Sequence, residues 1–547
     1  MKKDWFNELF LKGYNAYYWI TGLGFFTYIW TIFFGFTYFD DKTLILDNLY
    51  FLKNLGNIPT AFTTEVFHVL HASAAYYRPL LTISYMIDAQ FSGNSGFFYH
   101  FTDIIIHLIA SCLVYLFLTK LKIRKELAFL FSAIFAVHPV LSQGVVWLPG
   151  RNDSLLAVFV LSSFIFFIRF LDSQKTKDLV WHLAFFALAI FTKESAVLLP
   201  PMIVLYLILF VKTPIRSIKL NYVLTWIGIY FVWFILRAIA LTNPIHYGVL
   251  DVSKSLIRDL PAIALHFGKA MFPVNLSVLP ILQDSNFIYG YVSIALVLIL
   301  LAFSKGRNNK MVLFGIAWFL VFLVPSFVRP DPNYVADFLE HRIYLPIIGI
   351  FLILSEIEFI KKLDFLNKKI VFVLSTIIVI FTALNFIHTA KFRDKLVFWQ
   401  NAVIDAPHHP LAHKNLGAMY YLHKNFDQAE KQYKLALELN PQEVMTHNNL
   451  GLIYMERKDY VKAEDEYKKE LEINPLYDNA FFNYGILLYA TGRADDAEKF
   501  WLKTLQINPD YIDAMKNLLI LYSAKKDTEH AQYYYNQLQA RGIQLNY

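Results

Sequence analysis

Long apolar segments recur through the first 389 residues of the chain. Several of them are long enough to cross the roughly 30 Å hydrocarbon core of a bilayer as helices. The composition agrees, because only 17% of the 547 residues are charged, against about 25% in an average soluble protein. We therefore expect a polytopic membrane domain with about eleven transmembrane helices, at residues 17–37, 101–119, 127–142, 154–171, 179–192, 196–211, 221–241, 288–303, 311–327, 343–360 and 370–388.

The positions of Lys and Arg predict how this domain is oriented. Twenty of the 31 basic residues before residue 390 cluster in short segments that would share one membrane face: 1–12, 120–125, 169–177, 212–219, 305–310 and 361–369. Short loops rich in Lys and Arg stay in the cytoplasm. This places the N-terminus inside and residues 390–547 outside, and we favour a bacterial inner membrane over the endoplasmic reticulum. Two long outer segments, 38–100 and 242–287, hold shorter apolar stretches that are typical of helices lying in the interface.

The C-terminal part is polar and repeats every 34 residues. Asn415-Leu416-Gly417 recurs as Asn449-Leu450-Gly451 and Asn483-Tyr484-Gly485, and Asn440-Pro441 recurs twice at the same spacing. This is the period of tetratricopeptide (TPR) repeats, which are helix pairs that stack into a solenoid. We expect a TPR domain over 390–547 with about four repeats and a leading half-repeat. Its concave face would bind a protein or peptide, unless the array is only a rigid spacer.

Charged residues near the outer ends of the spans are the candidate functional groups, because charge beside a membrane is costly. An acidic pair, Asp40-Asp41, follows the first span and could supply a general base, a metal ligand or only a solvated loop. The basic and mixed groups predicted at the same face are Arg78, Arg151, Lys193-Glu194 and Glu340-His341-Arg342. Cations beside an acidic pair suit an anionic, membrane-borne substrate whose phosphate is held by Arg and Lys.

Histidines near these groups have less specific roles. His100, Asp103 and His107 share one helix face, and we expect hydrogen-bonded packing there rather than a metal site. His138-Pro139 reads as the end of a span. The single cysteine, Cys112, excludes a disulfide framework and a multi-cysteine zinc site.

Several of these motifs occur together in one known family. In chain order they are Asp40-Asp41, Tyr77-Arg78-Pro79-Leu80, Tyr99-His100, His138-Pro139-Val140, Gly150-Arg151-Asn152-Asp153, Lys193-Glu194 and Glu340-His341-Arg342-Ile343-Tyr344-Leu345-Pro346. With the array that follows them, they resemble the transmembrane, TPR-containing O-mannosyltransferases and their prokaryotic relatives in the GT-C glycosyltransferase superfamily. The resemblance covers nearly the whole chain.

The resemblance implies transfer of a sugar, expected to be mannose, from a polyprenyl-phosphate carrier to Ser or Thr hydroxyls of proteins, with inversion. It implies Asp40 as the base, with Asp41 positioning the acceptor or a divalent metal ion; no cofactor is otherwise expected, and no metal ligands are assigned. The residues implied to bind the donor phosphate are Arg78, Lys193, Arg342 and Arg151, with Glu194, Glu340, His100 and His138 in support. The expected partners are the lipid-linked sugar, membrane lipids and an acceptor protein held by the TPR groove, but no nucleic acid.

Other functions fit parts of the pattern. A GT-C enzyme could glycosylate a lipid or polysaccharide and use the repeats only to recruit partners. The chain could also be a non-enzymatic membrane scaffold, although a scaffold has no use for the acidic pair and the outer cations. A transporter is disfavoured because no inverted repeat of interrupted spans is visible.

Overall fold

The computed structural model describes residues 4–70, 76–211, 220–241, 248–328 and 335–543. Within these ranges the chain is helical and contains no β-strand, only an isolated bridge between Ile281 and Asp337. Contacts divide it into two units, Met1–Ala406 and Pro407–Tyr547. The predicted all-α fold is confirmed.

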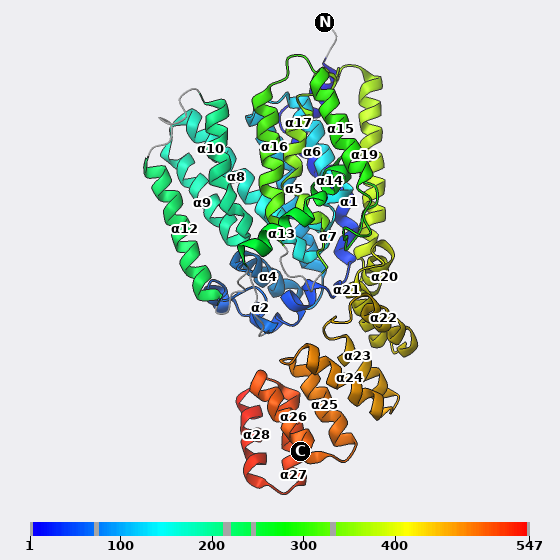
Figure 1. Ribbon diagram of the computed structural model, residues 1–547. Helices are drawn as coiled ribbons and strands as arrows, with labels where there is room; N and C mark the ends of the chain where they lie inside the picture. The colour runs from blue at the N-terminus through cyan, green and yellow to red at the C-terminus, as the bar shows by residue number, and fades with distance from the viewer. Residues whose placement is uncertain (1–3, 71–75, 212–219, 242–247, 329–334, 544–547) are drawn as a thin grey trace. The chain divides into compact units, whose positions relative to one another are not determined.

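The first unit is a bundle of long apolar helices with shorter helices at its ends (Figure 1). Its α-helices are α1 (Asn15–Tyr28), α2 (Leu49–Lys53), α3 (Ile58–Ala61), α4 (Pro79–Ser92), α5 (Phe97–Lys120), α6 (Lys125–Val137), α7 (Gln143–Val146), α8 (Arg151–Ser173), α9 (Thr176–Thr192), α10 (Leu199–Phe210), α12 (Leu220–Ala240), α13 (Val249–Asp259), α14 (Pro261–Met271), α15 (Ile288–Phe303), α16 (Asn309–Leu323), α17 (Ile347–Leu354), α18 (Glu358–Lys361), α19 (Lys368–Thr389) and α20 (Lys395–Asp405). Helix α5 packs against α1, α6 and α8, and so lies at the centre of the bundle.

A helix lies in each of the eleven predicted spans, but not every one is long enough to cross a bilayer alone. Among the described residues, five are long and apolar enough: Phe97–Lys120, Leu148–Ser173, Tyr222–Ala240, Asn309–Phe327 and Lys368–Phe392. Helix α6 and the segment Pro139–Val146 would form a sixth, bent by 53°. The first predicted span is interrupted where α1 gives way to a 3₁₀ helix at Ile29, and the tenth is reduced to α17, whose residues are buried. The protein thus has membrane-spanning helices, and the number eleven stays a prediction.

Segments that were predicted to face the cytoplasm meet at one end of the first unit. The Trp5 indole donates to the Leu366 carbonyl (3.2 Å), Arg124 donates to the Lys361 carbonyl (3.0 Å), and Lys361 reaches the Gly306 carbonyl (3.4 Å). Of the predicted basic segments, 212–219 and residues 1–3 lie outside the described residues. Helices α2 and α4 lie at the end opposite the N-terminus (Figure 1), and the candidate site lies there.

The described part of the second unit, residues 407–543, contains four helix pairs. They are α21 (Pro410–Leu422), α22 (Phe426–Leu439), α23 (Thr446–Glu456), α24 (Tyr460–Ile473), α25 (Asp478–Ala490), α26 (Ala494–Ile507), α27 (Ile512–Ala524) and α28 (Thr528–Ala540). The repeated asparagines Asn440, Asn474 and Asn508 are the C-caps of α22, α24 and α26, so the Asn-Pro pairs end the second helix of each repeat as predicted.

The boundary between the units differs from the predicted one at 389/390. Helix α20 belongs to the first unit. The Phe398 ring packs on Phe392 (5.6 Å) and the Trp399 ring packs on Phe39 (5.5 Å). The segment expected to be a leading half-repeat is therefore part of the first unit's core.

Candidate active site

The two members of the acidic pair have different surroundings. Asp41 is buried, and its Oδ2 accepts hydrogen bonds from the Thr37 backbone N–H (2.6 Å) and the Thr37 hydroxyl (2.9 Å). Burial raises the pKa of Asp41 to about 6, although these hydrogen bonds oppose the rise. Asp41 therefore closes the turn after the first span, while Asp40 beside it is partly exposed.

Stacked aromatic rings join the acidic pair to a distant segment. Phe39, directly before Asp40, stacks on Trp147 with centroids 5.5 Å apart and ring planes 24° apart. Trp147 also contacts the His341 ring, with centroids 5.1 Å apart and ring planes 46° apart. These contacts bring Asp40 and His341 to the same end of the bundle. Nothing in the sequence singled out Trp147, which is one of many apolar residues in that stretch.

Three of the predicted cations lie in this region, and each forms an ion pair with a carboxylate. Arg78 Nε is 3.3 Å from Glu194, and Glu194 also accepts from the Tyr77 backbone N–H (3.0 Å). Lys193 Nζ is 2.7 Å from both oxygens of Asp153. Arg342 pairs with Asp337. Glu194 and Asp153 are far in the chain from the cations they pair with, so spacing alone could not predict those two pairs, whereas Asp337 is five residues before Arg342.

The electrostatics of Lys193 show that the three cations act on one another. Burial lowers the pKa of Lys193, the Asp153 carboxylate opposes this, and the positive charges of Arg78 and Arg342 lower it further. The charges of all three side chains therefore sum in one region. Such a cluster can bind a phosphate through charge-assisted hydrogen bonds.

Asp153 is the centre of this cluster and was missed as a site residue. Besides Lys193, its carboxylate lies 3.5 Å from His341 Nε2. His341 in turn is fixed by Gln143, whose Oε1 accepts from the His341 backbone N–H (3.0 Å). The prediction from the motif Gly150-Arg151-Asn152-Asp153 named Arg151 as a phosphate ligand and gave Asp153 no role.

The surroundings of Arg151 do not fit the prediction that it binds the donor phosphate. Its side chain is fully buried, and it pairs with Asp88 (2.6 Å) and with Asp103. It also donates to the Tyr99 carbonyl (2.7 Å) and covers the Tyr85 ring. With its donors used in this way, Arg151 joins α4, α5 and α8 and is not presented to a phosphate.

Glu340, directly before His341, is buried in a network of ion pairs and hydrogen bonds. Its Oε1 accepts from Lys269 Nζ (2.6 Å) and from the Ser277 backbone N–H (2.9 Å), and His388 Nε2 lies 3.1 Å from its Oε2. Burial alone would raise the pKa of Glu340, but Lys269 and His388 hold it at about 2. This network fixes the short helix that carries His341 and Arg342 to α14 and α19.

The predicted histidines have packing roles. His138 Nδ1 accepts from the Val140 backbone N–H (3.2 Å), so its Nε2 carries the proton that it donates to the Ala270 carbonyl (3.0 Å). His107 Nδ1 bonds the Tyr344 hydroxyl (2.6 Å). His100 is buried near Phe34, with ring centroids 6.1 Å apart. Asp103 forms an ion pair with Arg151. The described residues contain no group of three or more His, Cys, Asp or Glu placed to hold a metal ion.

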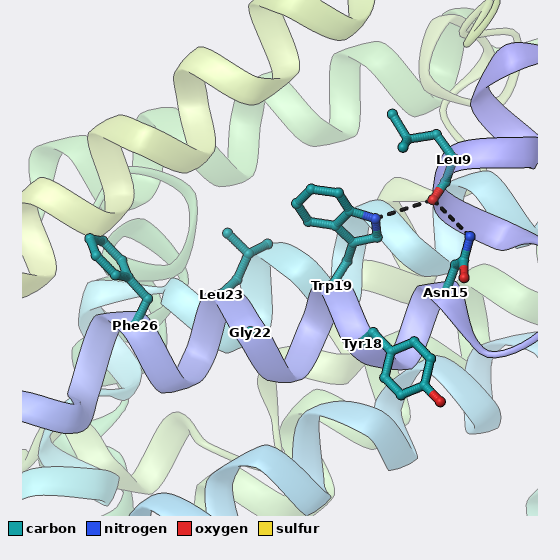
Figure 2. A pocket seen from close by; sticks show the side chains of 7 residues that line it. All are labelled: Leu9, Asn15, Tyr18, Trp19, Gly22, Leu23 and Phe26. Carbon is teal, nitrogen blue, oxygen red and sulfur yellow. Dashed lines mark hydrogen bonds between the residues drawn. The ribbon is translucent and has the colours of Figure 1, made fainter.

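A pocket of about 580 Å³ lies on α1, away from this site (Figure 2). It is lined by Leu9, Asn15, Tyr18, Trp19, Gly22, Leu23 and Phe26. Trp19 and Asn15 both donate to the Leu9 carbonyl (3.2 and 3.0 Å). None of these lining residues is a candidate site residue.

Comparison with known proteins points to one class of enzyme. Residues 79–241 match the family model described as dolichyl-phosphate-mannose-protein mannosyltransferase, and residues 410–443 and 444–477 match tetratricopeptide repeat models. The first of these ranges includes Asp153, Lys193 and Glu194. The chain thus joins a mannosyltransferase-like segment to TPR repeats.

Curated relatives named protein O-mannosyl-transferases match parts of this chain at low identity. Protein O-mannosyl-transferase TMTC1 of Mus musculus is 33% identical over 97 residues, covering 18% of this chain and 10% of the relative. TMTC3 of Homo sapiens is 27% identical over 157 residues (28% and 16%), and Tmtc1 of Drosophila melanogaster is 27% identical over 179 residues (32% and 21%). The matched segments therefore span only a tenth to a fifth of these relatives' length.

Two solved structures are similar to part of this chain. A crystal structure of MamA is 18% identical and covers 29% of this chain and 91% of its own, with a TM-score of 0.25. The first TPR of Spaghetti (RPAP3), bound to an HSP90 peptide, is 21% identical and covers 21% and 93%, with a TM-score of 0.21.

Proposed function

We propose that the protein is a glycosyltransferase that moves a sugar, mannose in the first instance, from a polyprenyl-phosphate carrier to protein hydroxyls. The main support for this proposal is the cluster of Arg78, Lys193 and Arg342, which lies at the end of the bundle where the acidic pair also lies. The mannosyltransferase match over 79–241 supports the same reading.

The residues account for the chemistry of a direct displacement. The acceptor oxygen attacks the anomeric carbon, the bond from that carbon to the phosphate oxygen breaks, and its electron pair stays on the phosphate. The hydroxyl proton passes to Asp40, which acts as general base. The phosphate needs no protonation to leave, so one base and a set of cations suffice. A single in-line displacement inverts the anomeric centre.

Asp41 is assigned a different role from the one first expected. Its hydrogen bonds to Thr37 hold the backbone beside Asp40, so it positions the base. The repeats of the second unit would hold the acceptor protein and raise its concentration near the membrane domain. A lipid or polysaccharide acceptor would leave the same donor chemistry in place and change only the role of the repeats.

Donor binding by the cations can be measured apart from catalysis. Lys193→Ala and Arg342→Ala should each weaken binding of a polyprenyl-phosphate sugar roughly 10-fold or more, the usual loss of a charge-assisted hydrogen bond. Lys362→Ala is the control, because Lys362 is 72% exposed and belongs to one of the predicted cytoplasmic segments. Donor affinity that is unchanged in both site variants would refute the phosphate clamp.

A further inference from the structure

The three cations of the site are paired in a crossed pattern. Lys193 and Glu194 are neighbours in the chain, yet Lys193 pairs with Asp153 and Glu194 pairs with Arg78. Arg342 pairs with Asp337. Three positive and three negative side chains are thus interleaved in the region where the proposed function needs a phosphate to bind.

These pairs differ from the purely structural ion pairs of the same unit. The carboxylates of Asp88, Asp103 and Glu340 are 3%, 0% and 0% exposed, and their cationic partners are equally buried. In the site, Glu194 is 28% exposed and Asp337 is 21% exposed. Glu194 and Asp337 are therefore within reach of an anion that enters from solvent. Asp153 itself is 6% exposed, but its partner Lys193 is 15% exposed.

The charge of the ligand changes during the proposed reaction. The donor is a phosphodiester with a single negative charge, and the leaving carrier is a phosphomonoester with about −1.5 to −2 at pH 7. A cluster of three uncompensated cations would therefore hold the product more tightly than the substrate. An enzyme with such a cluster would be slow to release its carrier.

We propose that Glu194, Asp153 and Asp337 are built-in competitors of the bound phosphate: they partly neutralise Arg78, Lys193 and Arg342 and stay close enough to repel the ligand, so that the doubly charged phosphomonoester is held less tightly than bare cations would hold it. This inference rests on the proposed function and deepens it. A fixed carboxylate repels a dianion about twice as strongly as a monoanion. The three carboxylates therefore set the preference of the site between substrate and product.

The test compares two probes on the full-length protein. Farnesyl phosphate stands in for the product, and its methyl phosphodiester stands in for the donor. Their dissociation constants are measured in nanodiscs for wild type and for Asp153→Asn, Glu194→Gln and Asp337→Asn. The matched control is Asp405→Asn, because Asp405 also pairs with a lysine, Lys391 (2.8 Å), without touching the site cations.

Removing one of the three carboxylates should raise the affinity for the monoester, relative to the affinity for the diester, by roughly 10-fold at pH 7.5. The control substitution should leave this ratio of affinities unchanged. The gain should disappear at pH 5, where the monoester carries one charge because its second pKa is about 6. A purely structural role would weaken both probes together and would not move the ratio.

Two results would overturn the inference in distinguishable ways. If wild type binds both probes and none of the three variants changes the ratio, the carboxylates are not competitors, while the proposed donor site stands. If wild type binds neither probe, the phosphate clamp itself is wrong and the inference falls with it. Because the three substitutions are separate and nearly isosteric, misfolding of one leaves the other two decisive.

Discussion

Neighbouring residues of the candidate site have different roles because their surroundings differ. Asp40 and Asp41 are adjacent, yet Asp41 is buried against Thr37 and Asp40 is partly exposed. Lys193 and Arg151 were both predicted to bind phosphate, yet Lys193 lies among other cations while Arg151 is enclosed by Asp88 and Asp103. Burial and partners, rather than residue type, decide which of them can act on a substrate.

Asp41 gives a prediction about pH. Its pKa is raised from 3.8 to about 6, so the folded state binds the proton more tightly than the unfolded state does. Stability from this group is full below about pH 4 and is lost as the pH rises through about 6. Asp41→Asn should remove this loss, so its thermal midpoint should rise relative to wild type between pH 4 and pH 7. A difference between the two proteins that does not change with pH would contradict the buried, proton-binding Asp41.

The sequence predicted part of the site and could not predict the rest. Arg78, Lys193 and Arg342 were predicted to bind phosphate because charges beside apolar segments stand out, and their roles stay predictions. Arg151 was misassigned because nothing in its spacing showed that Asp88 and Asp103 would enclose it. Trp147 and Asp153 were missed because their importance comes from contacts with segments far away in the chain.

At the scale of elements, close approach between helices explains the small residues of the repeats. A Cβ added at Gly417, Gly451 or Gly485 would lie 2.5–2.7 Å from the ring of Tyr433, Tyr467 or Trp501. The 34-residue period therefore predicted the helix pairs and their contacts correctly. The apolar runs of the first unit were less informative, because they do not show where a helix breaks, as α1 does at Ile29.

Gly451→Ala should destabilise the second repeat by about 1–3 kcal/mol, since the added methyl group overpacks the Tyr467 ring. Hydrogen exchange of the full-length protein should show faster exchange in α23 and α24. Val461→Ala is the control, because Val461 is 83% exposed in the same repeat. Unchanged protection in the Gly451 variant would mean that the helices can separate without cost.

At the scale of the whole molecule, the chain combines a membrane unit that carries the candidate site with a unit of repeats. The boundary at Ala406 allows the second unit to be removed without cutting the core that α20 forms with the first. This boundary separates the unit that we propose transfers the sugar from the repeats that we propose capture the acceptor.

Deleting residues 407–547 should reduce transfer to a protein acceptor roughly 100-fold, the loss expected when a tethered site is removed. Transfer to a short Ser- or Thr-containing peptide should change little. Equal loss for both acceptors would show that the repeats do not capture the acceptor.

The proposed role of Asp40 as the base of a lipid-phosphate-sugar transferase can be measured directly. Purified protein is incubated with a panel of polyprenyl-phosphate sugars and a hydroxyl acceptor peptide, and release of the carrier phosphate is measured. Wild type should release it with one donor, and Asp40→Asn should lose roughly 100-fold or more of that rate. Asp47→Asn, in the same loop and paired with Lys42 (2.7 Å), should keep it. Release of the carrier phosphate by Asp40→Asn at the wild-type rate would show that Asp40 is not the base.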